Sequence, residues 1–117
     1  MAAIKLETGR RVWFTPMVAR GASPGRVGMS AAVTAIPGAA FVGGWDGTLH
    51  ALSTVDGHKL WEFKTAREFA TVNGVTAKGG SFGAPGPTIG GGMLFVGSGY
   101  SVFGDTPGNV LLAFSIN

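Results

Sequence analysis

The sequence contains no cysteine. This absence excludes disulfide bridges, thiolate nucleophiles and metal sites built on cysteine. Charge is also scarce: charged residues make up 13% of the chain, with nine Lys and Arg against six Asp and Glu. The basic residues form no run and do not alternate with aromatic residues, so we expect no binding to nucleic acid.

Long uninterrupted apolar runs are missing as well. Residues 27–45 and 79–99 carry no charge, but glycine and proline break both segments, and we expect no membrane-spanning helix. Residues 1–9 lack the basic-then-apolar pattern of a signal peptide. If the parent protein is exported, its signal lies outside this chain.

Glycine is abundant instead, with 21 residues in 117, while 45% of the residues are hydrophobic. The apolar content is sufficient for a buried core, so the glycines belong to turns of an ordered fold rather than to a disordered chain. Short apolar segments cut by Pro-Gly, Gly-Gly and Asp-Gly are typical of many short strands. The sequence therefore predicts an all-β fold.

An internal repeat is the main feature of the chain. Residues 3–13 align with residues 51–61, so that alanine, glycine and tryptophan recur 48 positions apart. Residues 36–43 align with residues 90–97 at an offset of 54, which indicates a repeating unit with a loop of variable length. The repeated structural residues are Ala3, Gly9 and Trp13 in the first copy and Ala51, Gly57 and Trp61 in the second.

One full unit resolves into four short strands joined by glycine-containing linkers. Such linkers are short enough for antiparallel hairpins, and glycine supplies the positive φ that these turns need. The unit is thus a four-stranded antiparallel meander, the architecture of a β-propeller blade. The predicted strands are 30–36, 39–44, 48–53 and 59–64.

The spacing of alanine, then glycine six residues later, then tryptophan four further on, resembles the tryptophan-docking motif of propellers of the pyrroloquinoline-quinone (PQQ) type. That family has the pattern Ala-x-Asp-x-x-Thr-Gly-Lys-x-x-Trp. This sequence departs from it at the polar positions, where Lys5 and Ser53 replace aspartate, Asp56 replaces threonine, and Arg10 and His58 replace lysine. The residues 71–81, 93–96 and 108–114 further resemble the C-terminal end of polyvinyl-alcohol-dehydrogenase-like quinoproteins.

The chain holds about two blades, which is too few for a closed ring of roughly 4 to 8 blades. We expect residues 3–15 to form one outermost strand, 30–65 a full blade, and 87–116 a three-stranded final blade that the strand 3–15 could complete. Two explanations remain open. The chain is either a fragment of a longer propeller or a subunit that closes the ring as a homo-oligomer, four chains giving eight blades.

The variable loops all fall on one face of the predicted blades. Strand alternation places the tight turns on the other face, whereas 16–29, 66–86 and 98–108 lie on this one, and long loops in compact folds commonly carry function. The polar and aromatic residues expected there are Arg20, Arg26, Trp45, Asp46, Arg67, Asn73, Lys78, Ser81, Tyr100 and Asp105.

Four of these residues are candidates for binding the cofactor that the resemblance implies. Trp45 could stack on a planar quinone, or it could cover the end of a hairpin. Arg67, Asn73 and Lys78 could bind carboxylates of PQQ, or they could be exposed and solvated. Asp46 is a weak candidate for a calcium ligand or a general base, because Asp-Gly is common in turns. We expect Trp13 and Trp61 to pack between blades and not to stack on a cofactor.

The resemblance implies an exported or periplasmic bacterial quinoprotein that oxidises alcohols with PQQ and Ca²⁺ and uses an aspartate as base. PQQ would be surrounded by many blades, so we expect the isolated chain to be inactive. Two other functions stay open from the sequence. One is a non-catalytic propeller scaffold for protein docking, and the other is a small self-assembling structural or lectin-like ring.

Overall fold

The computed structural model describes residues 1–17, 28–100 and 106–116, and every helix or strand assigned in them is a strand. The all-β prediction is confirmed. Within these residues there is no helix that could span a membrane. The strands form a hairpin of β1 (Ala2–Ile4) and β2 (Arg11–Phe14), a four-stranded sheet of β3 (Thr34–Ile36), β4 (Ala39–Gly43), β5 (Thr48–Ser53) and β6 (Lys59–Lys64), a hairpin of β7 (Glu68–Ala70) and β8 (Thr76–Lys78), and a three-stranded sheet of β9 (Thr88–Gly90), β10 (Met93–Ser98) and β11 (Val110–Ser115).

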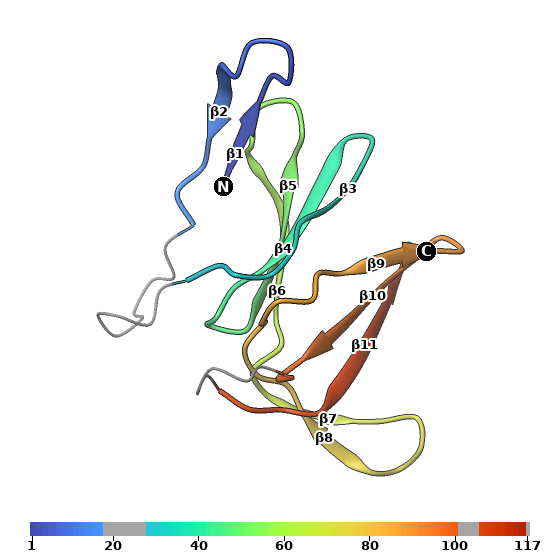
Figure 1. Cartoon of the computed structure of the whole chain (residues 1–117). Coiled ribbons are helices and arrows are strands. Elements are labelled where there is room, and N and C mark those ends of the chain that lie inside the picture. Colours follow the sequence, from blue (N-terminus) through green and yellow to red (C-terminus); the bar gives the residue numbers. More distant parts are fainter. Residues whose placement is uncertain (18–27, 101–105, 117) are drawn as a thin grey trace.

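The two larger sheets are antiparallel meanders with the same register (Figure 1). We call β3–β6 the complete blade, β9–β11 the partial blade, and β1–β2 the N-terminal hairpin. In the complete blade Phe41 lies opposite Ala51, and in the partial blade Phe95 lies opposite Ala113. In both, a threonine of the first strand faces that phenylalanine across the first pair of strands. The partial blade therefore corresponds to the first three strands of the complete one.

The first strand of the complete blade is shorter than predicted. The sequence predicted a strand over 30–36, whereas β3 begins at Thr34. Before that point the backbone N–H of Ala32 donates to the carbonyl of Ala84 at 3.1 Å, so the chain bonds to the connection between the blades instead of to β4. The third and fourth strands lie where they were predicted, over 48–53 and 59–64.

The N-terminal segment has two strands where the sequence predicted one. Gly9 adopts a φ of 66°, and its N–H donates to the carbonyl of Lys5 at 2.8 Å, which closes a turn between β1 and β2. Ala3 then lies opposite Trp13, as Ala51 lies opposite Trp61 in the complete blade. The N-terminal hairpin thus corresponds to the third and fourth strands of a blade, and β2 does not pair with β11.

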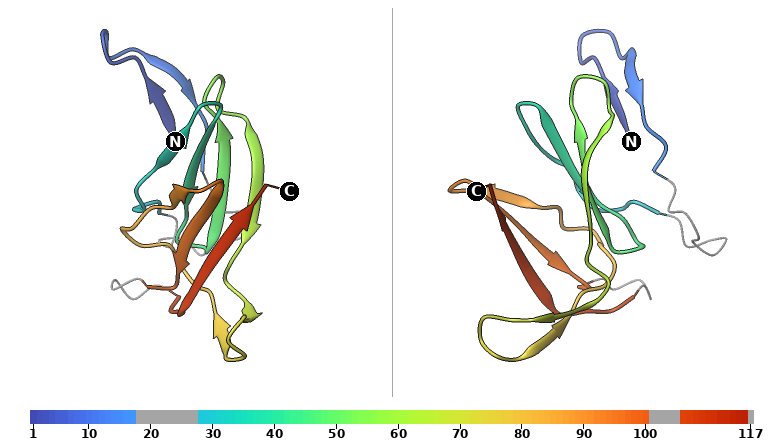
Figure 2. Two further views of the ribbon diagram at one scale, coloured as in Figure 1. Left: turned by 90° about the vertical axis from the view of Figure 1, so that its right-hand side faces the viewer. Right: turned by 180° about the vertical axis from the view of Figure 1, so that it is seen from behind.

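The connection 66–86 is also more ordered than predicted, because it contains the hairpin β7–β8. Phe69 lies opposite Ala77 in this hairpin, and Gly74 supplies a φ of 78° in its turn. The hairpin projects beyond the end of the complete blade that carries the β4–β5 turn (Figure 2). The turns β1–β2, β3–β4 and β5–β6 lie at the opposite end, as strand alternation predicts.

The core lies between the complete and the partial blade. Leu49 of β5 packs there with Leu94 and Val96 of β10, and all three are nearly inaccessible to solvent. Phe82, from the connection between the blades, fills the remaining space and is 1% exposed. Its ring occupies the position that a side chain on Gly43 would need, so only glycine fits at the end of β4.

Candidate functional site

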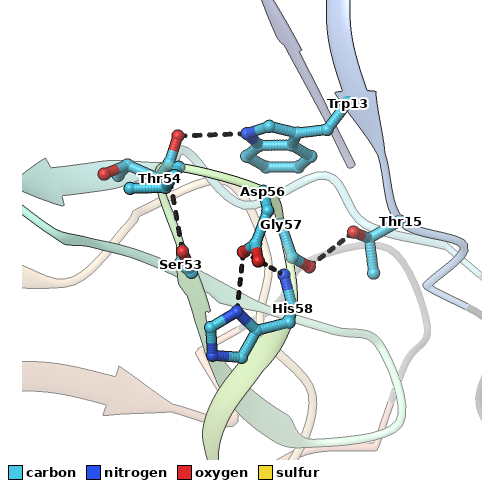
Figure 3. A network of polar contacts seen from close by, with 8 residues as sticks. Trp13, Thr15, Ser53, Thr54, Asp56, Gly57 and His58 are labelled. Atoms are coloured by element: carbon cyan, nitrogen blue, oxygen red, sulfur yellow. Dashed lines mark hydrogen bonds and ion pairs between the residues drawn. The ribbon is translucent and has the colours of Figure 1, made fainter.

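The turn between β5 and β6 receives the tryptophan of the N-terminal hairpin (Figure 3). The indole Nε1 of Trp13 donates to the carbonyl of Thr54 at 3.1 Å, and the hydroxyl of Thr15 donates to the carbonyl of Gly57 at 2.6 Å. Gly57 has a φ of 75°, and a Cβ there would overlap the ring of Trp13. Glycine is therefore needed both for the turn and for the contact, and we call 54–58 the docking turn.

The polar departures from the family pattern form their own hydrogen bonds in this docking turn. The carboxylate of Asp56 accepts from the backbone N–H of His58 at 3.2 Å and lies 2.6 Å from the Nδ1 of its imidazole. The Oγ of Ser53 accepts from the N–H of Val55 at 3.2 Å. The hydrogen bonds from His58 lower the pKa of Asp56 to about 2. The residues that depart from the family pattern therefore form hydrogen bonds of their own in this turn.

At the opposite end of the blades, two buried hydroxyls join three segments. The Oγ1 of Thr65 donates to the carbonyl of Gly47 at 2.8 Å and lies 2.7 Å from the Oγ of Ser98. Ser98 in turn exchanges hydrogen bonds of 2.9 Å with the N–H and the carbonyl of Gly80. Thr65 and Ser98 are both fully buried. We call these four residues the hydroxyl cluster; it ties β6 and β10 to the β4–β5 turn.

The segment 79–82 packs between the β4–β5 turn of the complete blade and Thr106 of the β10–β11 connection. A Cβ on Gly79 would overlap the carbonyl of Thr65, and one on Gly80 would overlap the carbonyl of Thr106. Ser81 follows, and its hydroxyl donates to the carbonyl of Trp45 and accepts from the N–H of Thr106 at 3.1 Å. Close backbone packing therefore accounts for the Gly-Gly pair, and Ser81 links the β4–β5 turn to the β10–β11 connection.

Trp45 lies in the β4–β5 turn as a half-buried, fixed ring. Its indole Nε1 donates to the Oγ of Ser30 at 2.7 Å, and its backbone N–H donates to the carbonyl of Gly28 at 3.0 Å. A Cβ on Gly28 would lie 2.8 Å from the Cδ2 of the indole, so the backbone of Gly28 packs closely against the ring. The ring is held by these contacts independently of any ligand.

Asp46 forms hydrogen bonds within the same β4–β5 turn. Its carboxylate accepts from the N–H of Thr48 at 3.1 Å and from the hydroxyl of Thr48 at 2.7 Å, which is the usual role of aspartate before glycine in a turn. In residues 1–17, 28–100 and 106–116 there is no group of three or more His, Asp and Glu side chains that could hold a metal ion.

The other predicted cofactor residues lie at separate places. The guanidinium of Arg67 stacks over the rings of Phe63 and Phe69, 5.1 and 4.8 Å from their centroids. The side-chain oxygen of Asn73 accepts from the N–H of Val75 at 3.2 Å within the β7–β8 turn. Lys78 is exposed at the end of β8. These three therefore do not converge on one polar site.

The structure brings together only part of the predicted loop face. The Ser81 hydroxyl bonds to the carbonyl of Trp45, whereas Tyr100, which follows β10, is 59% exposed. Sequence reasoning missed Thr65 and Ser98, because an isolated threonine and serine carry no spacing signal. Outside the described residues lie Arg20, Arg26 and Asp105.

Comparison with known proteins finds relatives of this chain. Over 98% of its length the chain is 41% identical to a protein named polyvinylalcohol dehydrogenase from Pseudomonas sp., and over 75% it is 39% identical to one of the same name from Sphingopyxis sp.. The chain is homologous to part of these polyvinylalcohol dehydrogenases. It covers 20% of the Pseudomonas protein and 15% of the Sphingopyxis protein. No family model matches the chain.

This relationship agrees with the resemblance noted in the sequence and with the antiparallel blades of the structure. The polyvinylalcohol dehydrogenases are several times longer than the chain, so the described blades correspond to a minor part of each relative. Their names describe a dehydrogenase activity of the whole relative.

Proposed function

We propose that this chain forms part of the wall of a PQQ-dependent, alcohol-oxidising propeller that acts in the periplasm or outside the cell. The observation that carries the proposal is the 41% identity to a polyvinylalcohol dehydrogenase over nearly the whole chain. Support also comes from the docking of Trp13 on Gly57, which is the interlocking contact that a ring of such blades requires. PQQ and Ca²⁺ come from the family resemblance.

The described residues do not form a complete site for PQQ. A planar quinone with several carboxylates needs an aromatic surface and a cluster of cationic or amide donors. Trp45 fits the first requirement, because Ser30 and Gly28 hold its ring in place. Arg67 and Asn73 do not fit the second, since the first is stacked on two phenylalanines and the second closes its own turn. Trp45 is therefore our main candidate for a cofactor contact, with Lys78 as the remaining cation.

The same holds for Ca²⁺. Both carboxylate oxygens of Asp46 accept hydrogen bonds from Thr48, and Ca²⁺ takes six to eight oxygen ligands. A complete metal site would require oxygen ligands beyond Asp46. We derive no catalytic step from this chain, and we propose that it is inactive by itself and supplies structure to the complete ring.

A chimaera provides the test of this proposal. The chain would replace the matching segment of the Pseudomonas polyvinylalcohol dehydrogenase, and oxidation of polyvinyl alcohol would be measured with PQQ, Ca²⁺ and a dye as electron acceptor. We expect the chimaera to be active and the isolated chain to be inactive. A folded chimaera that binds PQQ but has lost activity, or an active isolated chain, would contradict the proposal.

The role of Trp45 is tested in the same chimaera. Stacking on a ring contributes about 0.5–1.5 kcal/mol, so Trp45→Ala should weaken PQQ binding by up to roughly tenfold. Tyr100 is an exposed aromatic residue at the same end of the blades. The substitution Tyr100→Phe is the control and should leave the affinity for PQQ unchanged. Equal affinities of the Trp45→Ala and parent chimaeras would remove Trp45 from the cofactor site. A closed oligomer of the isolated chain that binds no PQQ would favour the docking scaffold or the structural ring instead.

A further inference from the structure

Three places in the sequence carry an aspartate or asparagine directly before a glycine. They are Asp46-Gly47, Asp56-Gly57 and Asn73-Gly74. In such a pair the backbone nitrogen of the glycine can attack the side-chain carbonyl carbon of the residue before it, because glycine has no Cβ to hinder the approach. The three pairs differ in the space around the glycine and in the group that would be attacked.

Packing protects the two aspartate pairs. Gly47 is buried, and a Cβ there would lie 2.7 Å from the Cβ of Ala66 and 2.8 Å from the carbonyl oxygen of Gly80. Gly57 is buried against the indole of Trp13. Neither glycine can turn towards the side chain before it without displacing these neighbours.

The side chains of the aspartate pairs are also poor targets for a nucleophile. The hydrogen bonds from His58 lower the pKa of Asp56 to about 2, so this carboxylate is ionised at neutral pH. The carboxylate of Asp46 is fixed by the backbone N–H and the hydroxyl of Thr48. A negatively charged carboxylate resists the addition of a nucleophile, whereas the amide of asparagine is neutral.

The third pair, Asn73-Gly74, lies in the open turn of the β7–β8 hairpin, which projects beyond the end of the complete blade (Figure 2). Both residues are exposed, and nothing lies within 4 Å of a Cβ built on Gly74. The N–H of Gly74 donates to the carbonyl of Thr71 at 3.1 Å. This hydrogen bond belongs to an exposed turn, and such turns open locally at a low cost in free energy.

The same turn polarises the side-chain amide of Asn73. Its Oδ1 accepts from the backbone N–H of Val75 at 3.2 Å, and the hydroxyl of Thr71 donates to the same oxygen. Negative charge develops on this oxygen when a nucleophile adds to the amide carbon, and donors already in place stabilise that charge. Asn73 therefore combines an open neighbouring glycine with an activated amide.

We propose that Asn73 is a site of spontaneous deamidation. The nitrogen of Gly74 loses its proton and forms a bond to the Cγ of Asn73, the bond from Cγ to the side-chain nitrogen breaks, and that nitrogen leaves as ammonia. Water then opens the resulting succinimide at one of its two carbonyl carbons and gives aspartate or isoaspartate, with no change of oxidation state. Either product places a carboxylate at the tip of the hairpin, and the formal net charge of the chain falls by one unit from +3.

Peptide mapping of the whole chain tests this proposal. The chain would be incubated at mildly alkaline pH, which favours loss of the Gly74 amide proton, and then digested with trypsin beside a sample that was not incubated. Asn73 lies in the tryptic peptide 68–78, and both Asp-Gly pairs lie in the peptide 27–59. We expect peptide 68–78 to gain about one dalton with time and to become a substrate for isoaspartyl methyltransferase.

Asn109 is the matched control within the same digest. It is exposed like Asn73, and its Oδ1 accepts from the N–H of Lys78 at 3.0 Å, but the buried, β-branched Val110 follows it. A β-branched neighbour hinders the attack, so we expect deamidation at Asn109 to be roughly tenfold slower or more. Urea supplies a second control, because unfolding removes the packing around Gly47 and Gly57, and isoaspartate should then appear in peptide 27–59 as well.

The substitution Asn73→Ser removes the amide and keeps an oxygen that can accept from Val75 in the turn. The mass increase and the methylation of peptide 68–78 should both disappear, while circular dichroism checks that the variant is folded. The proposal is overturned by a peptide 68–78 that stays unmodified in the folded chain, whether or not it reacts in urea. Equal deamidation of Asn109, or isoaspartate in peptide 27–59 at equal rates with and without urea, would overturn it too.

Discussion

The indole of Trp13 lies against Gly57 so closely that a Cβ on Gly57 would overlap its six-membered ring. This contact joins the N-terminal hairpin to the complete blade across 44 positions of sequence, and the hydrogen bonds to Thr54 and from Thr15 accompany it. Gly9 occupies the same place in the first repeat, and nothing lies within 4 Å of a Cβ built there. Comparing substitutions at Gly57 and Gly9 therefore separates the free-energy cost of the backbone conformation from that of the contact with Trp13.

Alanine substitution at these two positions should give different losses of stability. Gly57→Ala meets both a φ of 75° and the ring of Trp13, so we expect the free energy of unfolding to fall by about 2–4 kcal/mol. Gly9→Ala meets only a φ of 66°, and a loss of about 1–2 kcal/mol should follow. Urea unfolding followed by circular dichroism measures both. Equal losses would show that the Trp13 contact does not constrain Gly57.

The repeat could be predicted from the sequence because its alanine, glycine and tryptophan recur at fixed spacing. The number of strands in the N-terminal segment could not, since β1 has only three residues, Ala2–Ile4, and no alternation of apolar and polar side chains marks it. Its pairing depends on the turn at Gly9. The shortening of β3 was equally hidden, because the hydrogen bond from Ala32 to Ala84 depends on tertiary contact.

The hydroxyl cluster should be one of the points most sensitive to substitution. Thr65→Val keeps the shape of the side chain but removes the hydroxyl that bonds Gly47 and Ser98 in a fully buried place. We expect a loss of about 0.5–1.5 kcal/mol in the free energy of unfolding, the net contribution of one hydrogen bond, because the Gly47 carbonyl keeps the backbone N–H of Thr65 and the Ser98 hydroxyl keeps Gly80. Thr76→Val, at an exposed position of β8, is the matched control and should change stability by less than about 0.5 kcal/mol.

The candidate site was less predictable than the fold for a physical reason. Arg67 and Asn73 are polar residues in a long connection, which is the usual sign of a binding role. The structure uses both locally, because β7 and β8 form a hairpin that brings Phe69 beneath the guanidinium and closes its turn with the Asn73 amide. Such local use depends on strand pairing that the composition of 66–86 did not indicate.

The docking turn should have a distinctive acid titration. The hydrogen bonds from His58 lower the pKa of Asp56 to about 2 in the folded chain, below the ordinary value of 3.8. The contribution of this carboxylate to stability is therefore present above about pH 4 and is lost as the pH falls towards 2. Titration of the Asp56 carboxyl carbon by NMR measures the pKa directly. His58→Ala should return it towards 3.8, and an unchanged pKa in that variant would contradict the assigned cause.

His50 should make stability depend on pH in a higher range. Its Nδ1 is buried without a hydrogen-bond partner, and the Oε2 of Glu62 lies 3.7 Å away. Burial lowers the pKa of His50 below 6.5, and this effect outweighs the attraction of Asp46 and Glu62, which raise it; Lys59 adds to the lowering. The folded chain thus binds a proton at His50 more weakly than the unfolded chain does.

The sign of the dependence follows from this difference. The contribution of neutral His50 to stability is complete above pH 6.5 and declines as the pH falls through 6.5 towards the lowered pKa. Urea unfolding between pH 7.5 and 5 should therefore show a falling midpoint in the parent chain and a flatter profile in His50→Gln. His58→Gln removes the only other histidine, which is exposed, and should retain the decline. A midpoint that rises towards pH 5 in the parent chain would mean that attraction to the carboxylates of Asp46 and Glu62 outweighs burial in setting the pKa of His50.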